Sequence, residues 1–245
     1  MTEPRRIAMW SGPRNISTAM MRAFENRADT AVWDEPFYAF YLKRTGIDHP
    51  MAEAVIDAHE SDFEAVVARC IAPPPDGARI HYQKHMTHHM LDDVDLGWLE
   101  HLSHCFLIRH PASVAASYAQ KRQSVTADDL GFRRQAELFD RVAKAEGAAP
   151  PVIDAADVLA DPAGLLSALC QRMAIPFDAA MLRWPSGPRA SDGVWGKHWY
   201  GAVEKSTGFA APPGPAVAPV GALQSVADSC MPFYERLYAC RLKSD

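Results

Sequence analysis

The sequence predicts an α/β fold: a doubly wound, mainly parallel sheet with helices on both of its faces. Short apolar runs alternate along the chain with longer segments whose apolar residues recur at helical spacing. One run, residues 105–108, is apolar throughout, which is typical of a parallel strand buried on both faces. With 245 residues, 48% of them hydrophobic, the chain can bury a full core, and we expect a single domain over residues 1–245.

Five short apolar runs are the strand candidates, and turn-forming or charged residues end them. In chain order they are residues 7–10, 30–33, 79–83, 105–108 and 151–154. The clearest stops are Ser-Gly-Pro after the first run, Asp-Glu-Pro after the second and Arg-His-Pro after the fourth. Open α/β sheets bind ligands at the carboxyl ends of their strands, so these stops are where we expect a site.

The segments between and after these runs carry apolar residues at helical spacing, and proline or an N-capping side chain begins or ends several of them. The helix candidates are residues 17–24, 51–72, 88–102, 114–120, 127–146, 162–173 and 220–241. Residues 185–219 are rich in glycine, proline and aromatic residues instead. That composition predicts a long irregular loop that covers a ligand.

Composition and charge narrow the classes of function. The chain has 25 Lys and Arg against 30 Asp and Glu, a formal net charge of −5, which argues against nucleic-acid or acidic-membrane binding. Five widely separated cysteines favour reduced thiols over a disulfide framework. The N-terminus lacks a long apolar signal region, and no run approaches the ~20 apolar residues of a membrane span. We therefore expect a cytoplasmic protein without membrane or nucleic-acid partners; the sequence predicts no oligomeric state.

The segment from Gly12 to Thr18 joins the first strand candidate to the first helix candidate. A loop at a helix N-terminus aims unpaired backbone N–H groups and the positive end of the helix dipole at one point, which makes an anion site. Arg14 adds a planar cation suited to paired phosphate or sulfate oxygens. The alternative is a strand-turn-helix corner with an exposed arginine.

This loop differs from the nucleotide-triphosphate P-loop, G-x-x-x-x-G-K-[ST]. Counted from Gly12, the second glycine would fall at Ser17 and the lysine at Thr18. The segment therefore lacks the β/γ-phosphate cation and the magnesium-holding hydroxyl in their expected order. A phosphate-type ligand that binds without an obligatory metal is favoured over Mg-ATP.

A second segment, from Arg109 to Tyr118, leaves the fourth strand candidate and enters a helix. Arg109 lies at the strand end and Ser117 one to two turns into the helix, so a fork of donors and a hydroxyl can face the same phosphate. The alternative is a surface arginine and a helix-facing serine. Lys121 and Arg122, just beyond, are interpreted as the coating of a helix end, with adenosine contact as the alternative.

Together, and in this order, the two segments resemble the binding motifs of sulfotransferases that use 3′-phosphoadenosine 5′-phosphosulfate (PAPS). The first family motif contains Pro-Lys/Arg-Ser-Gly-Thr-Thr, and the second is Arg-x-Pro-x-x-x-x-x-Ser-Tyr/Phe. The first is matched by Pro13-Arg14-Asn15-Ile16-Ser17-Thr18, with isoleucine where glycine is usual, and the second by Arg109, Pro111, Ser117 and Tyr118. Residues 152–176 resemble a further family stretch, so the resemblance covers most of residues 7–177.

The resemblance implies a three-layer sandwich like that of P-loop NTPases, PAPS as co-substrate, adenosine 3′,5′-bisphosphate as product, and no required metal. It implies that Arg109 and Ser117 bind the 3′-phosphate. The residues it assigns to the 5′-phosphosulfate are Gly12, Pro13, Arg14, Asn15, Ile16, Ser17 and Thr18. Residues 193–200 stand where the family folds a segment over the 3′-phosphate and adenine. Lys197 is there a candidate phosphate contact, and Trp195 is a candidate stacking platform or a packing residue.

Sulfuryl transfer to a hydroxyl needs a base and a cation for the charge that grows on the bridging oxygen. Glu35 resembles the strand-end glutamate proposed as base in bacterial carbohydrate sulfotransferases. Lys84-His85 resembles the Lys-Thr-His segment of steroid and phenol sulfotransferases. We assign Glu35 as base and Lys84 as transition-state cation, with His85 as the rival base. Asp34 and Glu35 as a capping or loop-ordering pair are the alternative.

His81, His85, His88 and His89 form a histidine-rich patch. No cysteine or carboxylate nearby completes a recognised zinc pattern, so solvated loop and helix histidines are the ordinary explanation and no metal is expected.

The sequence thus predicts a sulfotransferase that moves a sulfuryl group from PAPS to a hydroxyl of a small-molecule or carbohydrate-like acceptor. The alternatives are a P-loop-type ATP-dependent kinase and a non-catalytic protein that binds adenosine 3′,5′-bisphosphate. The geometric condition is that Arg14 and Arg109 converge on opposite ends of one doubly phosphorylated adenosine.

Overall fold

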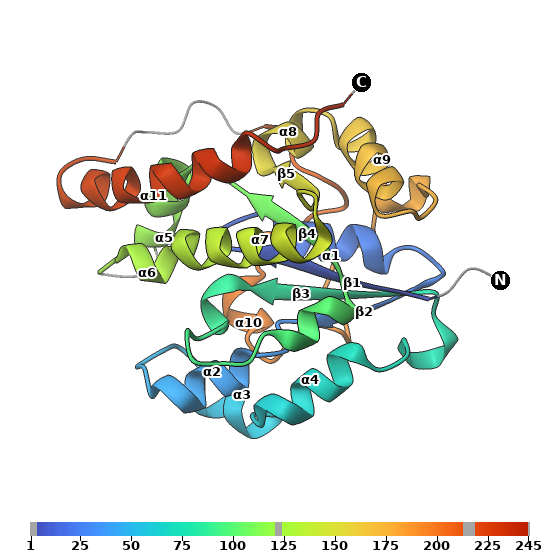
Figure 1. The fold of residues 1–245 in the computed structure, drawn as a ribbon, viewed down its shortest axis with the longest axis horizontal. Helices are drawn as coiled ribbons and strands as arrows, with labels where there is room; N and C mark the ends of the chain where they lie inside the picture. The colour runs from blue at the N-terminus through green and yellow to red at the C-terminus, as the bar shows by residue number, and fades with distance from the viewer. Residues whose placement is uncertain (1–3, 121–123, 213–218, 245) are drawn as a thin grey trace.

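The computed structural model describes residues 4–120, 124–212 and 219–244, and its centre is a five-stranded parallel sheet (Figure 1). The strand order is β2-β3-β1-β4-β5, so β1 lies in the middle. The strands are β1 (Arg5–Ser11), β2 (Thr30–Asp34), β3 (Ile80–Met86), β4 (Ser103–Ile108) and β5 (Val152–Asp154). This confirms the predicted α/β fold.

The sheet is covered on both faces, and its three central strands β1, β3 and β4 are buried at nearly every position. In β1, Ile7 and Met9 belong to the hydrophobic cluster on one face, and Ala8 and Trp10 belong to the cluster on the other. This alternation follows from the two-residue period of a strand. The register places Ser11 opposite both Met86 and Leu107, so the three central strands end close together.

Helices surround the sheet (Figure 1). The cluster around Ile7 and Met9 includes side chains of α1 and α9, whereas the cluster around Trp10 includes side chains of α4, α7 and α11. The helices are α1 (Ser17–Glu25), α2 (Tyr38–Thr45), α3 (Ala52–Ala58), α4 (Phe63–Ile71), α5 (Pro111–Ala119), α6 (Ala127–Leu130), α7 (Phe132–Glu146), α8 (Ala155–Ala160), α9 (Pro162–Arg172), α10 (Gly196–Trp199) and α11 (Ala222–Tyr238).

Two of the expected helices are each divided in two. Residues 51–72 form α3 and α4, because Asp62 adopts an extended conformation and its carboxylate accepts a hydrogen bond from the N–H of Ala65 to begin a new helix. Residues 127–146 form α6 and α7, which meet at Gly131 with a φ of 71°. Only a residue that tolerates left-handed backbone fits there.

The prediction of a helix over residues 88–102 is wrong. This stretch holds only two short 3₁₀ turns, Thr87–His89 and Gly97–His101. Between them, the Asp95 carboxylate accepts a hydrogen bond from the N–H of Gly97, a local bond that competes with helix formation.

A third hydrophobic cluster attaches part of the predicted irregular segment to the rest of the molecule. Trp195 and Tyr200 pack there against Tyr38 and Leu42 of α2 and Val55 of α3. Residues 213–218 of that segment, and Lys121 and Arg122, lie outside the described residues.

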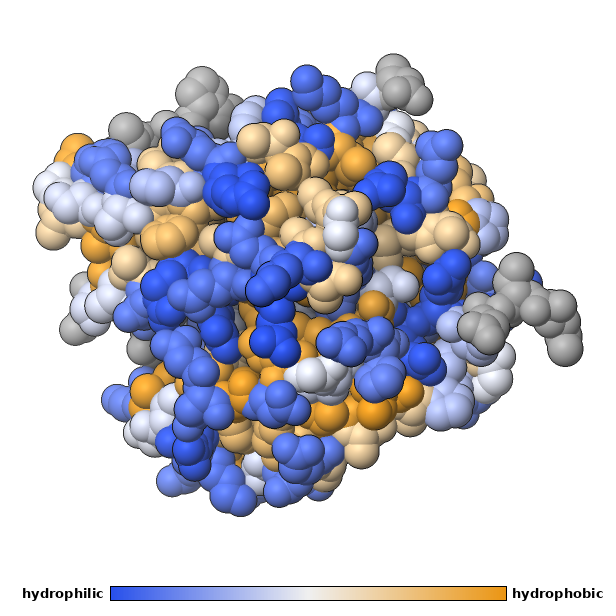
Figure 2. Space-filling view, in the orientation of Figure 1, coloured by the Kyte–Doolittle hydropathy of each residue, from blue (hydrophilic) through white to orange (hydrophobic). Residues whose placement is uncertain are grey.

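Hydrophilic and apolar side chains intermingle on the face shown in Figure 2. Within the described ranges, no helix has both the length and the apolar character needed to cross a membrane.

Candidate active site

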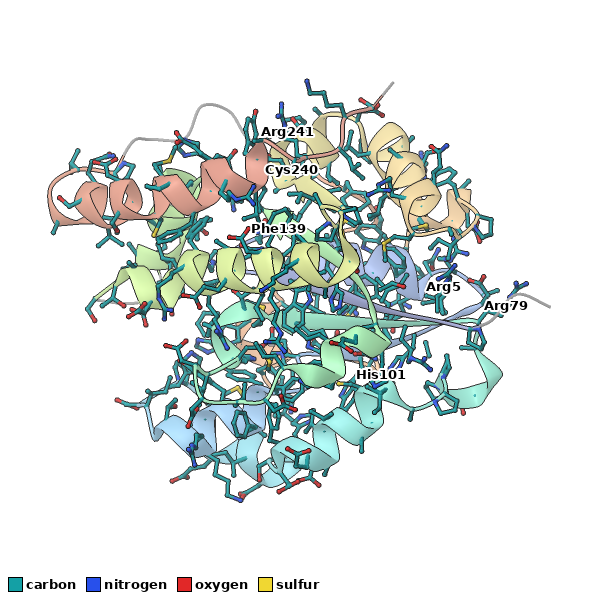
Figure 3. All side chains as sticks on the ribbon, in the orientation of Figure 1. Arg5, Arg79, His101, Phe139, Cys240 and Arg241 are labelled. Carbon is teal, nitrogen blue, oxygen red and sulfur yellow. The ribbon has the colours of Figure 1, made fainter. Side chains whose placement is uncertain are left out.

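A cavity of about 360 Å³ lies along the carboxyl edge of the sheet, and its lining follows the order of the strands. Glu35 comes directly after β2, Lys84 lies near the end of β3, residues 13–18 follow β1, and Arg109 follows β4. The opposite edge, where β1 and β3 begin, carries Arg5 and Arg79 (Figure 3). The topology therefore brings separate sequence segments into one site.

The loop after β1 is shaped by contacts with its neighbours. Gly12 is buried, and a Cβ there would lie 2.6 Å from the main-chain oxygen of Leu130, so this glycine permits close packing. Asn15 donates a hydrogen bond of 3.1 Å from Nδ2 to the oxygen of Leu107, and its Oδ1 accepts one from the N–H of Ile16. These contacts fix the loop at the start of α1.

The N-terminus of α1 borders the cavity, where Ile16, Ser17 and Thr18 are part of the lining. Within the described residues, no side chain caps this terminus. The first N–H groups of a helix have no intrahelical acceptor and carry the positive end of its dipole. This end of the cavity is therefore suited to an anion.

Arg14 and Arg109 meet beside this helix end. Nη1 of Arg109 donates a hydrogen bond of 2.7 Å to the main-chain oxygen of Arg14, and Nε of Arg14 donates one of 3.1 Å to Oγ of Ser117. All three residues line the cavity, so the two arginines meet at one site; that they bind opposite ends of one doubly phosphorylated adenosine stays a prediction. Arg14 has a φ of 55°, and its left-handed backbone is held by these neighbours.

The electrostatics of this pair favour an anionic ligand. Burial lowers the pKa of Arg14; burial and then the charge of Arg14 lower the pKa of Arg109. Among the described residues, neither guanidinium forms an ion pair, in contrast to Arg22, which pairs with Glu25 and Asp192. The Asp154 charge acts on Arg109 only from beyond salt-bridge distance, so two neighbouring partly buried cations without a salt bridge in the described ranges suit a ligand with more than one negative charge.

At the β2–β3 end of the cavity, Lys84 is the centre of a buried polar cluster. Its Nζ donates hydrogen bonds to Oδ1 of Asp34 (2.9 Å), Oε1 of Glu35 (2.7 Å) and the hydroxyl of Tyr200 (2.7 Å). The Tyr200 hydroxyl donates in turn to Oδ2 of Asp34 (2.7 Å) and accepts from Nε1 of Trp195 (3.0 Å). An ammonium has three N–H donors, so Lys84 is fully used.

Glu35 combines an unusual backbone with a shifted pKa. Its φ is 41°, and its main-chain N–H donates to the oxygen of Lys84 at 2.9 Å. Burial raises the pKa of Glu35; the Lys84 ammonium lowers it and the Asp34 charge raises it, with a net rise. Burial alone lowers the pKa of Lys84, but the charges of Asp34 and Glu35 hold it well above its usual value. Lys84 is therefore charged, and the Glu35 carboxylate that it contacts is more basic than that of an ordinary glutamate.

Lys84 and His85 point to opposite faces of the sheet because they are neighbours on one strand. His85 stacks on Trp10 at 4.5 Å, shares a 3.1 Å hydrogen bond with Oε1 of Gln83, and lies outside the cavity lining. Burial lowers its pKa to about 3. The structure therefore brings Glu35 and Lys84 to the cavity but not His85.

The histidine-rich patch is not solvated, contrary to expectation. His81, His85 and His89 are 4%, 1% and 2% exposed, and burial lowers the pKa of His81 and His88 to about 4. The residues that the structure describes contain no group of three or more His, Cys, Asp or Glu arranged to hold a metal ion.

The covering segment reaches the cavity through residues other than the two singled out in the sequence. Lys197 is exposed on α10 and lies outside the lining, and Trp195 is buried in an edge-to-face contact with Tyr38. Trp199 and Tyr200 line the cavity instead. No sequence motif marks Tyr200; its part in the Lys84 cluster depends on tertiary packing.

Comparison with known families agrees with this geometry. A family model described as a sulfotransferase domain matches residues 5–241. The chain belongs to the sulfotransferase family.

Solved sulfotransferase structures share the fold. The sulfotransferase domain of the Synechococcus PCC 7002 olefin synthase has a TM-score of 0.60 at 16% identity, with 96% of each chain covered. A sulfotransferase from Alicyclobacillus acidocaldarius has a TM-score of 0.55 at 12% identity, covering 98% of this chain and 96% of that one. At these identities the likeness concerns the fold alone.

Two similar curated proteins of Arabidopsis thaliana are named branched-chain-amino-acid aminotransferase-like proteins 1 and 2. They are 37% and 34% identical over 86% and 97% of this sulfotransferase chain, and over 38% and 42% of their own lengths. The chain spans about two fifths of the length of these relatives, so their names describe proteins that are mostly outside the match.

Proposed function

We propose that this sulfotransferase transfers a sulfuryl group from PAPS to a hydroxyl of a small-molecule or carbohydrate-like acceptor. The observation that carries the proposal is the Arg14–Arg109 pair, which borders the cavity without ion-pair partners among the described residues, next to an uncapped helix N-terminus. PAPS carries a 5′-phosphosulfate and a 3′-phosphate, and this site offers separate cationic groups for the two.

The lining residues fit PAPS in the following roles. The N–H groups at the start of α1 and the Arg14 guanidinium bind the phosphosulfate, and Arg109 with Ser117 binds the 3′-phosphate. Gly12 acts through the shape of the loop. Bound PAPS supplies a sulfuryl group whose bond to the phosphate oxygen breaks as the acceptor oxygen bonds to sulfur. Leu159 of α8 lies at the β5 side of the cavity, where an adenine would meet apolar surface.

Glu35 is the proposed base. It takes the proton from the acceptor hydroxyl as that oxygen attacks, and its raised pKa makes the carboxylate a better base than an exposed glutamate. Lys84 holds Oε1 of Glu35 at 2.7 Å and sets the orientation of the carboxylate. A direct role as transition-state cation requires Lys84 to exchange one of its three hydrogen bonds.

Calorimetric titration tests the donor half of the proposal. Adenosine 3′,5′-bisphosphate is expected to bind without added metal, and adenosine 5′-phosphosulfate, which lacks the 3′-phosphate, is expected to bind more weakly. Binding of Mg-ATP but not of the bisphosphate would favour a kinase and overturn the proposal.

Radiolabelled PAPS with a library of alcohols tests the transfer half. Labelled product is expected from at least one acceptor and not from the Glu35→Gln variant. Tight bisphosphate binding without any product would leave a non-catalytic binding protein.

A further inference from the structure

The charges that line the cavity are segregated along the edge of the sheet. Arg14 and Arg109 stand at the β1–β4 side, where the described residues offer them no ion pair. At the β2–β3 side, the Lys84 ammonium contacts two carboxylates, Asp34 at 2.9 Å and Glu35 at 2.7 Å. When Glu35 is deprotonated, the state in which it acts as the proposed base, one cation against two anions leaves an excess negative charge at this side.

The rest of the β2–β3 side adds rings and no compensating lysine or arginine within the described lining. The Tyr38 ring stacks on His89 with centroids 4.7 Å apart and planes at 11°, and Trp199 lies 5.9 Å from the ring of His49. Burial holds the pKa of His88 at about 4 and that of His89 well below its usual value, so both are uncharged at neutral pH.

Lys84 has no remaining donor for a second anion. Its three N–H groups are used by Asp34, Glu35 and Tyr200. An anionic acceptor would therefore meet the Glu35 carboxylate in a largely buried place without gaining a new cation, and like charges at short range repel strongly where water is excluded.

We propose that the β2–β3 side is an acceptor subsite for hydroxyl compounds without negative charge that lay a flat apolar face against the partly buried ring of Trp199. This inference rests on the proposed function, because it assumes that PAPS binds at the β1–β4 side, beside Arg14 and Arg109. Sugars and phenols share the required chemistry, a flat apolar face with a hydroxyl at its edge.

Two matched acceptor series test the inference with radiolabelled PAPS. The sugars are methyl glucoside, glucosamine and glucuronate; the phenols are 4-ethylphenol, tyramine and 4-hydroxyphenylacetate. In the series that reacts, the neutral and ammonium members should have a kcat/KM at least about tenfold above that of the carboxylate member. The reacting series identifies the acceptor source.

The outcomes separate the inference from the function beneath it. Equal turnover of the carboxylate and neutral members overturns the inference and leaves sulfuryl transfer intact. Bisphosphate binding without product from any of the six compounds overturns the assigned acceptor class. Absence of bisphosphate binding overturns the proposed function itself.

A pair of variants locates the charge responsible. Asp34→Asn removes the buried carboxylate that contacts Lys84 from behind the cavity lining, and should reduce the preference for the neutral over the carboxylate acceptor by about fivefold or more. Asp93→Asn removes the same charge from an exposed pair with Arg44 and should leave the preference unchanged. An unchanged preference in Asp34→Asn overturns the charge argument. Binding of adenosine 3′,5′-bisphosphate by Asp34→Asn shows that this variant is folded. If the variant does not fold, the acceptor series measured on the wild type decides the inference.

Discussion

Nη1 of Arg109 lies 2.7 Å from the main-chain oxygen of Arg14, although the two residues are 95 positions apart. The hydrogen bond joins the loop after β1 to the end of β4, and these strands are neighbours in the sheet. One guanidinium thus both shapes the loop and presents its remaining donors to the cavity.

Arg109→Ala should weaken the binding of adenosine 3′,5′-bisphosphate roughly 10- to 100-fold, because a charge-assisted hydrogen bond contributes about 1.5–3 kcal/mol. Arg109→Lys should recover only part of the affinity, since a lysine cannot bond Arg14 and a phosphate in a fork. The measurement is calorimetry at fixed ionic strength. Arg44→Ala, which removes an exposed arginine, is the control; equal affinities in Arg109→Ala and Arg44→Ala would contradict the assignment.

Ser117→Ala should have a smaller effect. The hydroxyl accepts the 3.1 Å hydrogen bond from Nε of Arg14, and its loss lets the guanidinium move. Only this one hydrogen bond from a charged donor is lost, which costs about 1.5 kcal/mol, so the affinity for the bisphosphate should fall about tenfold. Ser113→Ala lies on the same helix outside the cavity lining and should bind like the wild type. A loss of the same size in both variants would indicate a general effect on α5.

The convergence of Arg14 and Arg109 could be predicted from the sequence because it depends on one rule, that parallel strands end at a common edge. The alternation of side chains along a strand also helps to identify the base. Because Lys84 and His85 are neighbours on one strand, they point to opposite faces of the sheet and cannot both face one site. The Asp34–Tyr200 hydrogen bond could not be predicted, because it joins segments 166 positions apart through packing that no motif records.

The division of the helix expected over residues 51–72, and the absence of the helix expected over residues 88–102, show a second limit. Apolar spacing indicated helices there, but Asp62 and Asp95 offer the backbone local hydrogen bonds that compete with a continuous helix. Short polar side chains decide such boundaries, and the periodicity of apolar residues does not register them.

Glu35→Gln should lower kcat by about 10²- to 10⁴-fold, the range for removal of a general base, with bisphosphate affinity changed less than about twofold. The amide keeps the shape of the side chain but cannot take a proton. His85→Gln is the matched comparison for the rival base and should keep kcat close to that of the wild type, since His85 lies on the other face of the sheet. The reverse ranking of the two variants would make His85 the base.

The pH dependence of kcat/KM should show an acid limb above pH 4.5, the ordinary value for a glutamate, because burial and the Asp34 charge raise the pKa of Glu35. The base must be deprotonated, so activity is lost as the pH falls through this raised pKa. Asp34→Asn removes a neighbouring negative charge and should move the limb to lower pH. A limb that moves to higher pH, or stays in place, would contradict the coupling.

The free energy of unfolding should fall as the pH is lowered from about 6.5 to 4. Burial lowers the pKa of His81 and His104 to about 4 and that of His85 to about 3, from an ordinary 6.5. Within this window the unfolded chain binds protons that the folded chain does not, so each histidine contributes a slope of up to roughly 1.4 kcal/mol per pH unit. Urea denaturation at pH 7, 6 and 5 measures the slope.

His104→Gln, which also loses the 3.0 Å hydrogen bond from Trp10, should be less stable at pH 7 yet have a shallower slope. His198→Gln, which replaces an exposed histidine, is the control and should have the slope of the wild type. If His104→Gln also had the slope of the wild type, His104 would take up its proton as readily in the folded state as in the unfolded chain, contrary to the prediction.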